Sequence, residues 1–241
     1  MGSRLSREAN RQQSEASPTK NTSQTHEKNH NTKTVALTTS TLSNNLPHEF
    51  EAIIKDADTV IDKSSIDKLY DGVFLNKKRK KYWVDKASND NSFMVFARDL
   101  SITWGEDSRY WHWPYIKETS EEVLEVAELL AVCWLEVNGK FEISKLTPGI
   151  KYEVVFVVML NDRANGWEVP INIRLVLPDG SKQEHKENIM EKPRSKWFEI
   201  PVGEFMVGAK KGGFVEFSLY QQGINWKKGL LVKGVAIRPK I

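Results

Sequence analysis

The chain has 241 residues, of which 39% are hydrophobic and 28% are charged, a composition typical of one or two globular domains with a polar extension. Its single cysteine, Cys133, excludes an intrachain disulfide and favours a reducing compartment. No run approaches 18 apolar residues and no apolar segment opens the chain. We therefore expect neither a membrane span nor a secretory signal.

The net charge of +3 is carried by the N-terminal part of the chain. Residues 1–48 contain six basic and three acidic groups, which leaves 29 of each sign in the remainder. A domain that binds phosphates usually has a net basic surface. The neutral balance therefore argues against nucleic-acid binding as the main activity.

Residues 1–46 contain no aromatic side chain and are dominated by Ser, Thr, Asn, Gln and charged residues. Such a segment cannot bury enough apolar surface to offset its ordering entropy, so we predict a disordered tail. Its start, Met1 to Ser6, fits the N-myristoylation pattern with Gly2 as acceptor, which predicts weak, reversible membrane association. The metalloprotease-like pattern His26-Glu-Lys-Asn-His30 lacks helical periodicity, and we interpret it as a chance match.

Residues 47–71 change character, because apolar residues recur there at spacings of three and four after Pro47. They are Phe50, Ile53, Ile54, Ala57, Val60 and Ile61. This spacing predicts one short amphipathic helix, and a second over residues 64–70. We expect this helical segment to pack on the edge of the main domain, residues 72–241.

From Val73 onward the pattern is that of β-strands, short runs rich in β-branched and aromatic residues and separated by glycine-containing turns. The predicted strands are Tyr82–Asp85, Phe93–Ala97, Asp99–Trp104, Val132–Val137, Tyr152–Leu160, Ile171–Leu177, Trp197–Val202, Phe214–Gln221 and Leu230–Arg238. With no interleaved helices, they predict an all-β, jelly-roll-like sandwich. Leu146 to Tyr152 has the pattern of a tyrosine corner, so Tyr152 is expected to be structural. Cys133 is in phase with Leu135 and Val137 and is expected to be an inert buried thiol.

Five consecutive cations, Lys77 to Lys81, precede the first of these strands. The simpler interpretation is a solvated turn. The alternative is a nuclear-localisation or RNA-binding patch, in which the adjacent Tyr82 and Trp83 would stack on bases.

Recognition chemistry is concentrated between Asp99 and Trp113, where Trp104, Tyr110, Trp111 and Trp113 surround a polar turn. A core could absorb Trp104 or Trp113, but burying all four rings beside Glu106 to Arg109 is harder. A pyranose has a C–H face that stacks on an aromatic ring and a rim of hydroxyls that needs polar partners. We therefore predict carbohydrate binding on Trp104 and Trp111, with Trp113 adjacent.

The polar rim of this predicted site is expected to come from Asp107, Ser108 and Gln221. Catalysis is not expected, because His112 and His185 are the only histidines in the main domain and neither has a catalytic setting. No clustered ligands predict a metal, no glycine-rich loop predicts a phosphate site, and no cofactor is expected.

The block ARDLSITW at residues 97–104, followed by YWHW at 110–113, resembles the phloem protein 2 and Nictaba-type plant lectins. The likeness continues through VCWLEV (132–137), LTPG (146–149), VGEF (202–205), WKKG (226–229) and KGVAIRP (233–239). The resemblance implies a sandwich similar to carbohydrate-binding modules. It also implies N-acetylglucosamine oligomers or N-glycan cores, alone or on glycoproteins, as ligands, and a cytoplasmic or nuclear location in phloem sieve elements.

In these lectins the tryptophans that match Trp104 and Trp111 are tied to sugar binding, together with two glutamates near the C-terminal strands. Phe214 and Gln221 stand at those two positions here. Gln221 can still hydrogen-bond a hydroxyl, whereas Phe214 cannot. The alternative hypothesis is a phloem structural component that binds RNA or filament proteins and does not bind sugar. A homo-oligomer is compatible with either hypothesis.

Overall fold

A computed structural model describes residues 46–119, 122–209 and 212–240. The myristoylation pattern at Gly2, the His26–His30 pattern and nearly all of the predicted disordered tail lie outside these residues. None of the helices within the described ranges is long and apolar enough to cross a membrane.

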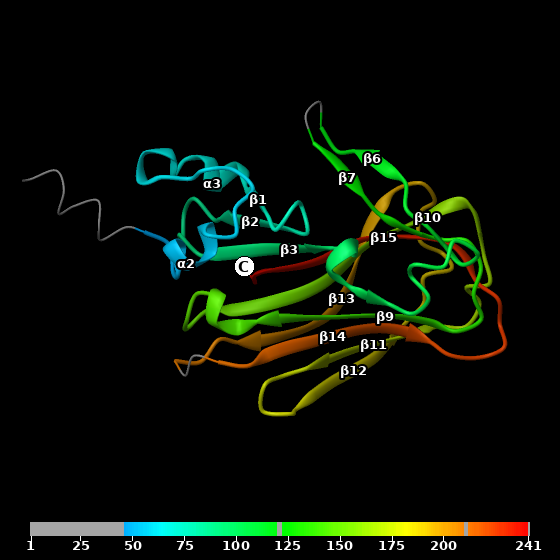
Figure 1. Cartoon of the computed structure of the whole chain (residues 1–241). Coiled ribbons are helices and arrows are strands. Elements are labelled where there is room, and N and C mark those ends of the chain that lie inside the picture. The colour runs from blue at the N-terminus through cyan, green and yellow to red at the C-terminus, as the bar shows by residue number, and fades with distance from the viewer. Residues whose placement is uncertain (1–45, 120–121, 210–211, 241) are drawn as a thin grey trace, which may run out of the picture. The chain divides into compact units, whose positions relative to one another are not determined.

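Two antiparallel sheets form a sandwich, which confirms the all-β prediction (Figure 1). The larger sheet has the strand order β1-β2-β3-β15-β10-β13, with β8 and β5 attached beside β15. Its strands are β1 (Val73–Leu75), β2 (Lys80–Val84), β3 (Asn91–Phe96), β5 (Trp111–His112), β8 (Ala127–Leu129), β10 (Lys151–Asn165), β13 (Trp197–Met206) and β15 (Lys228–Pro239).

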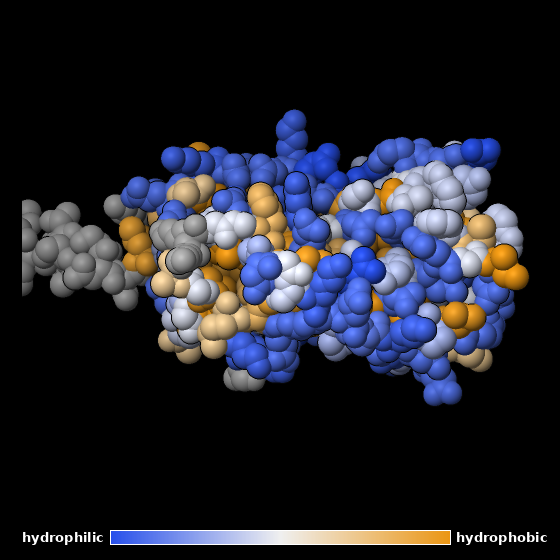
Figure 2. All heavy atoms as spheres, turned by 90° about the horizontal axis from the view of Figure 1, so that it is seen from below, coloured by the Kyte–Doolittle hydropathy of each residue, from blue (hydrophilic) through white to orange (hydrophobic). Residues whose placement is uncertain are grey.

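The second sheet has the order β12-β11-β14-β9-β4, and a separate hairpin pairs β6 with β7. These strands are β4 (Ser101–Ile102), β9 (Leu135–Glu142), β11 (Ile171–Val176), β12 (Lys182–Glu187), β14 (Phe214–Gln221), β6 (Tyr115–Lys117) and β7 (Val123–Glu125). Hydrophilic residues cover most of the face of the molecule on the side of this sheet (Figure 2). One face of the second sheet is therefore solvated and the other packs on the core, as is common for antiparallel sheets.

The core lies between the sheets and is filled by alternate residues of the long strands. Val154, Phe156 and Val158 of β10 are at most 1% exposed, and they face Phe217 and Leu219 from β14 within one apolar cluster. Burying such side chains is the main favourable term in folding. The predicted strands β11 and β14 show regular alternation of buried and less buried residues. The predicted strands β3, β10 and β15 are also present, but they contain runs of consecutive buried residues.

The helical segment is shorter than its periodicity predicts. It forms α2 (Phe50–Ile54), the 3₁₀ turn η1 (Lys63–Ser65) and α3 (Lys68–Asp71). The carboxylate of Asp62 caps η1 by accepting from the backbone N–H of Ser64 at 3.0 Å. Helix α2 ends at Ile54, and the chain then pairs with β1 through a bridge between Ala57 and Leu75, so Ile61 is buried in the connecting loop rather than on a helix. Two further 3₁₀ turns, η2 (Ala97–Asp99) and η3 (Ile143–Lys145), connect strands.

The tyrosine corner is present. The Tyr152 hydroxyl accepts from the Thr147 N–H at 3.1 Å and donates to the Asn91 carbonyl at 2.8 Å. Desolvation by burial raises the pKa of Tyr152, so this hydroxyl stays protonated and structural.

The expectation of a sealed Cys133 thiol is wrong, because this residue is only half-buried. Strand β9 begins at Leu135, and Cys133 lies in a bend before it. The inward alternation therefore starts two residues later than the sequence pattern suggests.

Candidate functional site

Trp104 lies in the turn that follows the short strand β4, in an unusual backbone conformation. Its φ of 58° is in the left-handed region, which costs roughly 1–2 kcal/mol for a residue with a side chain. A bulky residue in this region is a genuine outlier. The conformation turns the chain away from β9 directly after Ile102, so the predicted strand Asp99–Trp104 is reduced to Ser101–Ile102.

The Trp104 ring lies at the surface with 46% of the residue exposed. Its nearest aromatic partner is Tyr110, with ring centroids 5.2 Å apart and a tilt of 37°. Asp107 builds the loop between them, because its N–H donates to the Trp104 carbonyl at 2.9 Å and its own carbonyl accepts from the Tyr110 N–H at 2.9 Å. The open indole face expected at this position is present.

The structure contradicts the prediction that a sugar binds on Trp111. Trp111 is 2% exposed, and its Nε1–H donates to the Thr103 carbonyl at 3.1 Å. Because β5 pairs with β8, with Trp111 opposite Leu129, the ring is directed into the core. A ring in this position offers no face to a saccharide.

Trp113 is half-buried, and one face of its ring is covered. The Arg98 guanidinium carbon lies 3.6 Å from the ring centroid, and the indole Nε1–H donates to the Gly105 carbonyl at 2.8 Å. A cation–π contact of this kind holds the ring in place. Trp113 therefore forms a wall of the site rather than an open stacking surface.

Beside Trp104 lies a hollow of about 410 Å³, a size within the range of small-ligand sites. Its lining includes Arg98, Ser101, Ile102, Trp104, Glu106 and Trp113. The hollow thus combines an exposed indole with a hydroxyl, a carboxylate and a guanidinium.

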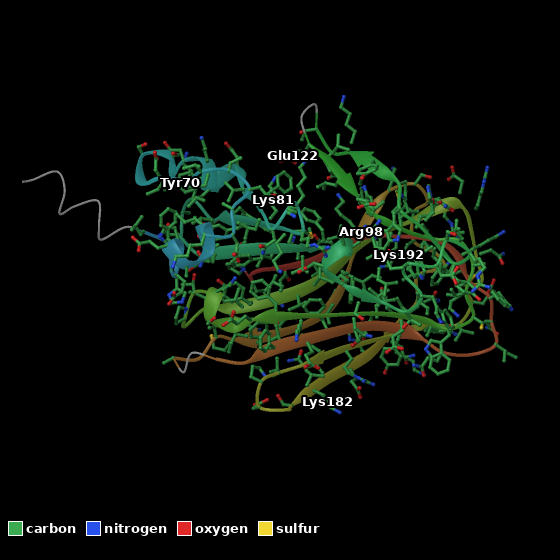
Figure 3. The ribbon with its side chains drawn as sticks, in the orientation of Figure 1. Tyr70, Lys81, Arg98, Glu122, Lys182 and Lys192 are labelled. Carbon is green, nitrogen blue, oxygen red and sulfur yellow. The ribbon has the colours of Figure 1, made fainter. Side chains whose placement is uncertain are left out.

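Arg98 organises this hollow from the 3₁₀ turn η2. Its Nη2 and Nε donate to both carboxylate oxygens of Glu125 at 2.6 and 2.8 Å, and Nη1 donates to Glu106 at 3.2 Å. These bonds, chiefly those to Glu125, raise the pKa of Arg98, and the bidentate geometry fixes the guanidinium plane. Figure 3 shows Arg98 near the middle of the molecule, beneath the β6–β7 hairpin that carries Glu125.

The sequence prediction missed Arg98, Ser101 and Glu106. Arg98 and Ser101 belong to the ARDLSITW block, but no local pattern in the sequence tells which of its polar residues face Trp104. Glu106, whose side chain is 90% exposed, reads simply as a turn residue.

Asp107 does not line the hollow. Its carboxylate accepts from the Arg109 side chain at 2.6 Å and from the Arg109 N–H at 3.0 Å. The side-chain bonds with Arg109 are the main cause that lowers the pKa of Asp107 to about 2. Asp107 therefore does not supply the expected polar rim of the sugar site, because its carboxylate is bound within the turn. Ser108 is exposed in the same turn, and neither residue lines the hollow.

Gln221 is also misplaced by the prediction, since it is 5% exposed. It ends β14 opposite Leu135, and its Oε1 is the one buried side-chain polar atom without a hydrogen-bond partner among the described residues. Phe214 lies at the other end of the same strand, and Lys140 covers its ring at 5.1 Å. Phe214 and Gln221 stand at the two ends of β14. At roughly 3.4 Å per residue they are about 24 Å apart, so they do not form one site.

Two further exposed tryptophans lie at the Trp104 end of the sandwich and were not predicted as site residues. They are Trp134, 45% exposed, and Trp226, 61% exposed. The buried Lys227 joins their loops, because its ammonium donates to the Cys133 and Asn225 carbonyls, each at 2.8 Å. Gly166 permits this packing, since a Cβ there would lie 1.9 Å from the Trp226 carbonyl oxygen.

The cation run forms the tight turn between β1 and β2. The N–H groups of Lys77 and Lys78 donate to the Asp58 carboxylate at 2.6 and 2.7 Å. Lys80 pairs with Asp99 at 2.5 Å, and Lys81 pairs with Glu122 at 2.9 Å (Figure 3). Two of the five cations are therefore partly neutralised, and RNA binding by this run stays a prediction.

Metal binding would need clustered ligands. Over the ranges that the structure describes, no group of three or more His, Cys, Asp or Glu residues is placed to hold an ion.

Comparison with known proteins places this architecture among plant sequences. The family description Phloem protein 2 matches residues 90–239. The Arabidopsis thaliana "Protein PHLOEM PROTEIN 2-LIKE A1" is 51% identical over 201 residues, covering 80% of this chain and 81% of that protein. A protein named "Lectin" from Luffa acutangula is 48% identical over 199 residues, covering 80% of this chain and 94% of that protein.

A solved structure, the CBM22-1 xylan-binding domain from Paenibacillus barcinonensis, is 12% identical and covers 60% of this chain and 87% of that domain. Its TM-score is 0.35. A similarity this low gives no support for a shared binding mode.

Proposed function

Because this chain belongs to the phloem protein 2 family, we propose that it is a lectin that binds glycans in the hollow beside Trp104 without changing them chemically. The ligands are N-acetylglucosamine oligomers or N-glycan cores, held by stacking of a pyranose face on the Trp104 indole. The protein acts in the cytoplasm or nucleus of phloem cells.

The observation that carries the proposal is the strained, exposed Trp104. The left-handed conformation costs folding free energy, and a residue that stays 46% exposed offsets little of that cost by burial. Strain of this kind persists where the surrounding structure imposes it, and it concentrates at ligand sites. The relatives from Luffa acutangula and Coccinia grandis that are named lectins add support from outside the structure.

The polar groups of the hollow suit a sugar rim. Ser101 can donate to or accept from a hydroxyl, and Glu106 is an exposed acceptor. The outer edge of the Arg98 guanidinium, held by Glu125, can donate. Because the hollow is open and shallow, we expect weak binding at each site.

The test is a calorimetric titration of the full chain with chitotriose. Trp104→Ala should lower affinity at least tenfold, which corresponds to about 1.4 kcal/mol. Phe214→Ala removes an equally exposed ring at the far end of β14 and should leave affinity unchanged. A titration of the Trp104→Ala variant that is unchanged in both affinity and molar ratio of bound chitotriose would refute the proposed site.

A further inference from the structure

A second hollow, of about 630 Å³, lies where the β2–β3 hairpin meets the start of β10 and the end of β15. Its walls include Trp83, Asp90, Ser92, Gly149, Lys151 and Arg238. Its volume suits a small ligand. None of these residues lines the Trp104 hollow.

Two polar side chains at this hollow have no hydrogen-bond partner among the residues that the structure describes. Asp90 is only 6% exposed, yet its carboxylate has no hydrogen bond or ion pair with any residue that the structure describes. The Trp83 indole N–H likewise has no acceptor among those residues. Neither group belongs to the fully buried polar atoms that lack a partner, so both reach solvent in the hollow and are free to hydrogen-bond a ligand there.

The next residue shows how thoroughly this region satisfies its polar atoms otherwise. The Asn91 side chain donates to the His48 and Lys145 carbonyls at 2.7 and 2.8 Å, and it accepts from the Tyr82 hydroxyl at 2.9 Å. The Asp90 carboxylate, directly beside this network, is not used by it and stays free to bond a ligand in the hollow.

The charges around the hollow select the class of ligand. Its cations are already paired: Lys151 with Glu204 at 2.6 Å, Arg238 with Glu153 at 2.7 Å and with Glu199 at 2.6 Å, and Lys240 with Glu204. An anionic ligand would therefore meet Asp90 without an unpaired cation to offset it. A neutral molecule that carries hydroxyl groups can donate to Asp90 and accept from Trp83.

We propose that this hollow is a second carbohydrate site, in which a neutral pyranose lies against Trp83 and hydrogen-bonds Asp90 and Ser92. The choice of carbohydrate rests on the proposed function, whereas the site itself is independent of Trp104. Strand β15 runs from Lys228, beside Trp226, to Pro239 at this hollow. The Trp104 hollow is lined instead by η2, β4 and the residues that follow them, so the two sites share no lining residue.

The test follows the indole N–H signals of the ¹⁵N-labelled full chain by nuclear magnetic resonance during titration with N-acetylglucosamine, chitotriose and glucosamine. The Trp83 signal is identified by its absence from the spectrum of Trp83→Phe. We expect it to shift with both neutral saccharides, and to do so equally in Trp104→Ala. Asp90→Ala should weaken this response about tenfold, whereas Asp179→Ala, which removes a carboxylate from a remote turn, should not.

Three results separate the two proposals. A Trp83 signal that neither neutral saccharide moves, in a variant or parent chain with a well-dispersed spectrum, overturns the second site. A signal that moves only with glucosamine also overturns it, because the hollow would then select an ammonium group. A shift at Trp83 without any effect of Trp104→Ala on chitotriose affinity supports the second site and refutes the first.

Discussion

Trp104 and Trp111 lie seven residues apart in the sequence and make opposite contributions to the molecule. Trp104 adds little packing and carries backbone strain. Trp111 fills the core and bonds the Thr103 carbonyl, so it supports the loop from which Trp104 projects. Under the proposed function we expect both residues to be needed for binding, but only Trp104 to touch the ligand.

This contrast predicts different stabilities for the two alanine variants. Trp111→Ala should lower the free energy of unfolding by about 3–5 kcal/mol, because it leaves a large cavity in the core. Trp104→Ala should change it by less than about 1 kcal/mol, as for other surface substitutions. Urea denaturation followed by circular dichroism measures both values. A severely destabilised Trp104→Ala would show that the indole is structural and would weaken the binding role assigned to it.

Asn91 is the second residue whose loss should be severe. Its replacement by alanine leaves the Tyr82 hydroxyl without its acceptor and the His48 and Lys145 carbonyls without their donor. Each unmet buried group costs about 1–3 kcal/mol, so Asn91→Ala should lose at least about 2 kcal/mol of unfolding free energy. Asn165→Ala, at an exposed position, is the control, and equal stability of the two variants would contradict the network.

The sequence could not separate these roles. Trp104 and Trp111 occur in one aromatic-rich stretch, and residue type alone does not reveal a left-handed backbone or a pairing with β8. Gln221 was expected to be polar and accessible, but its position in β14 opposite Leu135 directs it inward. The exposed ring could be predicted, whereas its polar neighbours depend on long-range packing of η2 and β7.

At the scale of elements, alternation predicted the long strands well. Phe214–Gln221 appears with the expected bounds as β14, and Ile171–Leu177 appears one residue shorter as β11. Strand β12 was missed, because Lys182–Glu187 consists of charged and polar residues at the edge of a sheet. The short strands β5 to β8 were missed because two or three residues carry no usable period.

The β6–β7 hairpin is attached to the sandwich largely by ion pairs. Glu118 binds Lys233 at 2.7 Å, Glu122 binds Lys81 at 2.9 Å and Glu125 binds Arg98 at 2.6 Å. Arg98 lines the Trp104 hollow, and Glu125 of the hairpin holds its guanidinium in place. Loss of the hairpin's attachment should therefore also disturb the hollow.

The bond between Glu125 and Arg98 predicts that the stability of the fold depends on pH. This hydrogen bond lowers the pKa of Glu125 below the ordinary value of 4.5. A carboxylate with a depressed folded-state pKa contributes stability above its unfolded-state value, and this is lost as the pH falls through the folded-state value. Glu125→Gln should therefore lower the melting temperature at pH 6 and reduce its dependence on pH below 4.5.

Thermal unfolding monitored between pH 3 and 6, a window set by this titration, measures the effect. Glu168→Gln, at an exposed carboxylate in contrast to the part-buried Glu125, should follow the parent profile. An unchanged pH dependence in Glu125→Gln would mean that the Arg98 pair contributes nothing measurable, as is true of many surface ion pairs.

At the scale of the whole molecule, two binding sites with separate linings would make one chain bivalent. A bivalent monomer can bridge two glycan-coated surfaces, and linkage of two weak sites raises the overall affinity without any new contact. The full chain should therefore agglutinate beads coated with chitotriose. Agglutination should disappear in either Trp83→Ala or Trp104→Ala, while each variant still binds to a single coated surface through its remaining site.

A homodimer with one site per chain would also agglutinate beads, so the variants decide between the two arrangements. In a dimer only Trp104→Ala would abolish agglutination, and Trp83→Ala would agglutinate as strongly as the parent chain. Analytical ultracentrifugation at the assay concentration reports the mass directly. A monomeric parent chain that agglutinates, together with a Trp83→Ala variant that binds but does not agglutinate, would establish that a single sandwich bridges the beads through two separate sites.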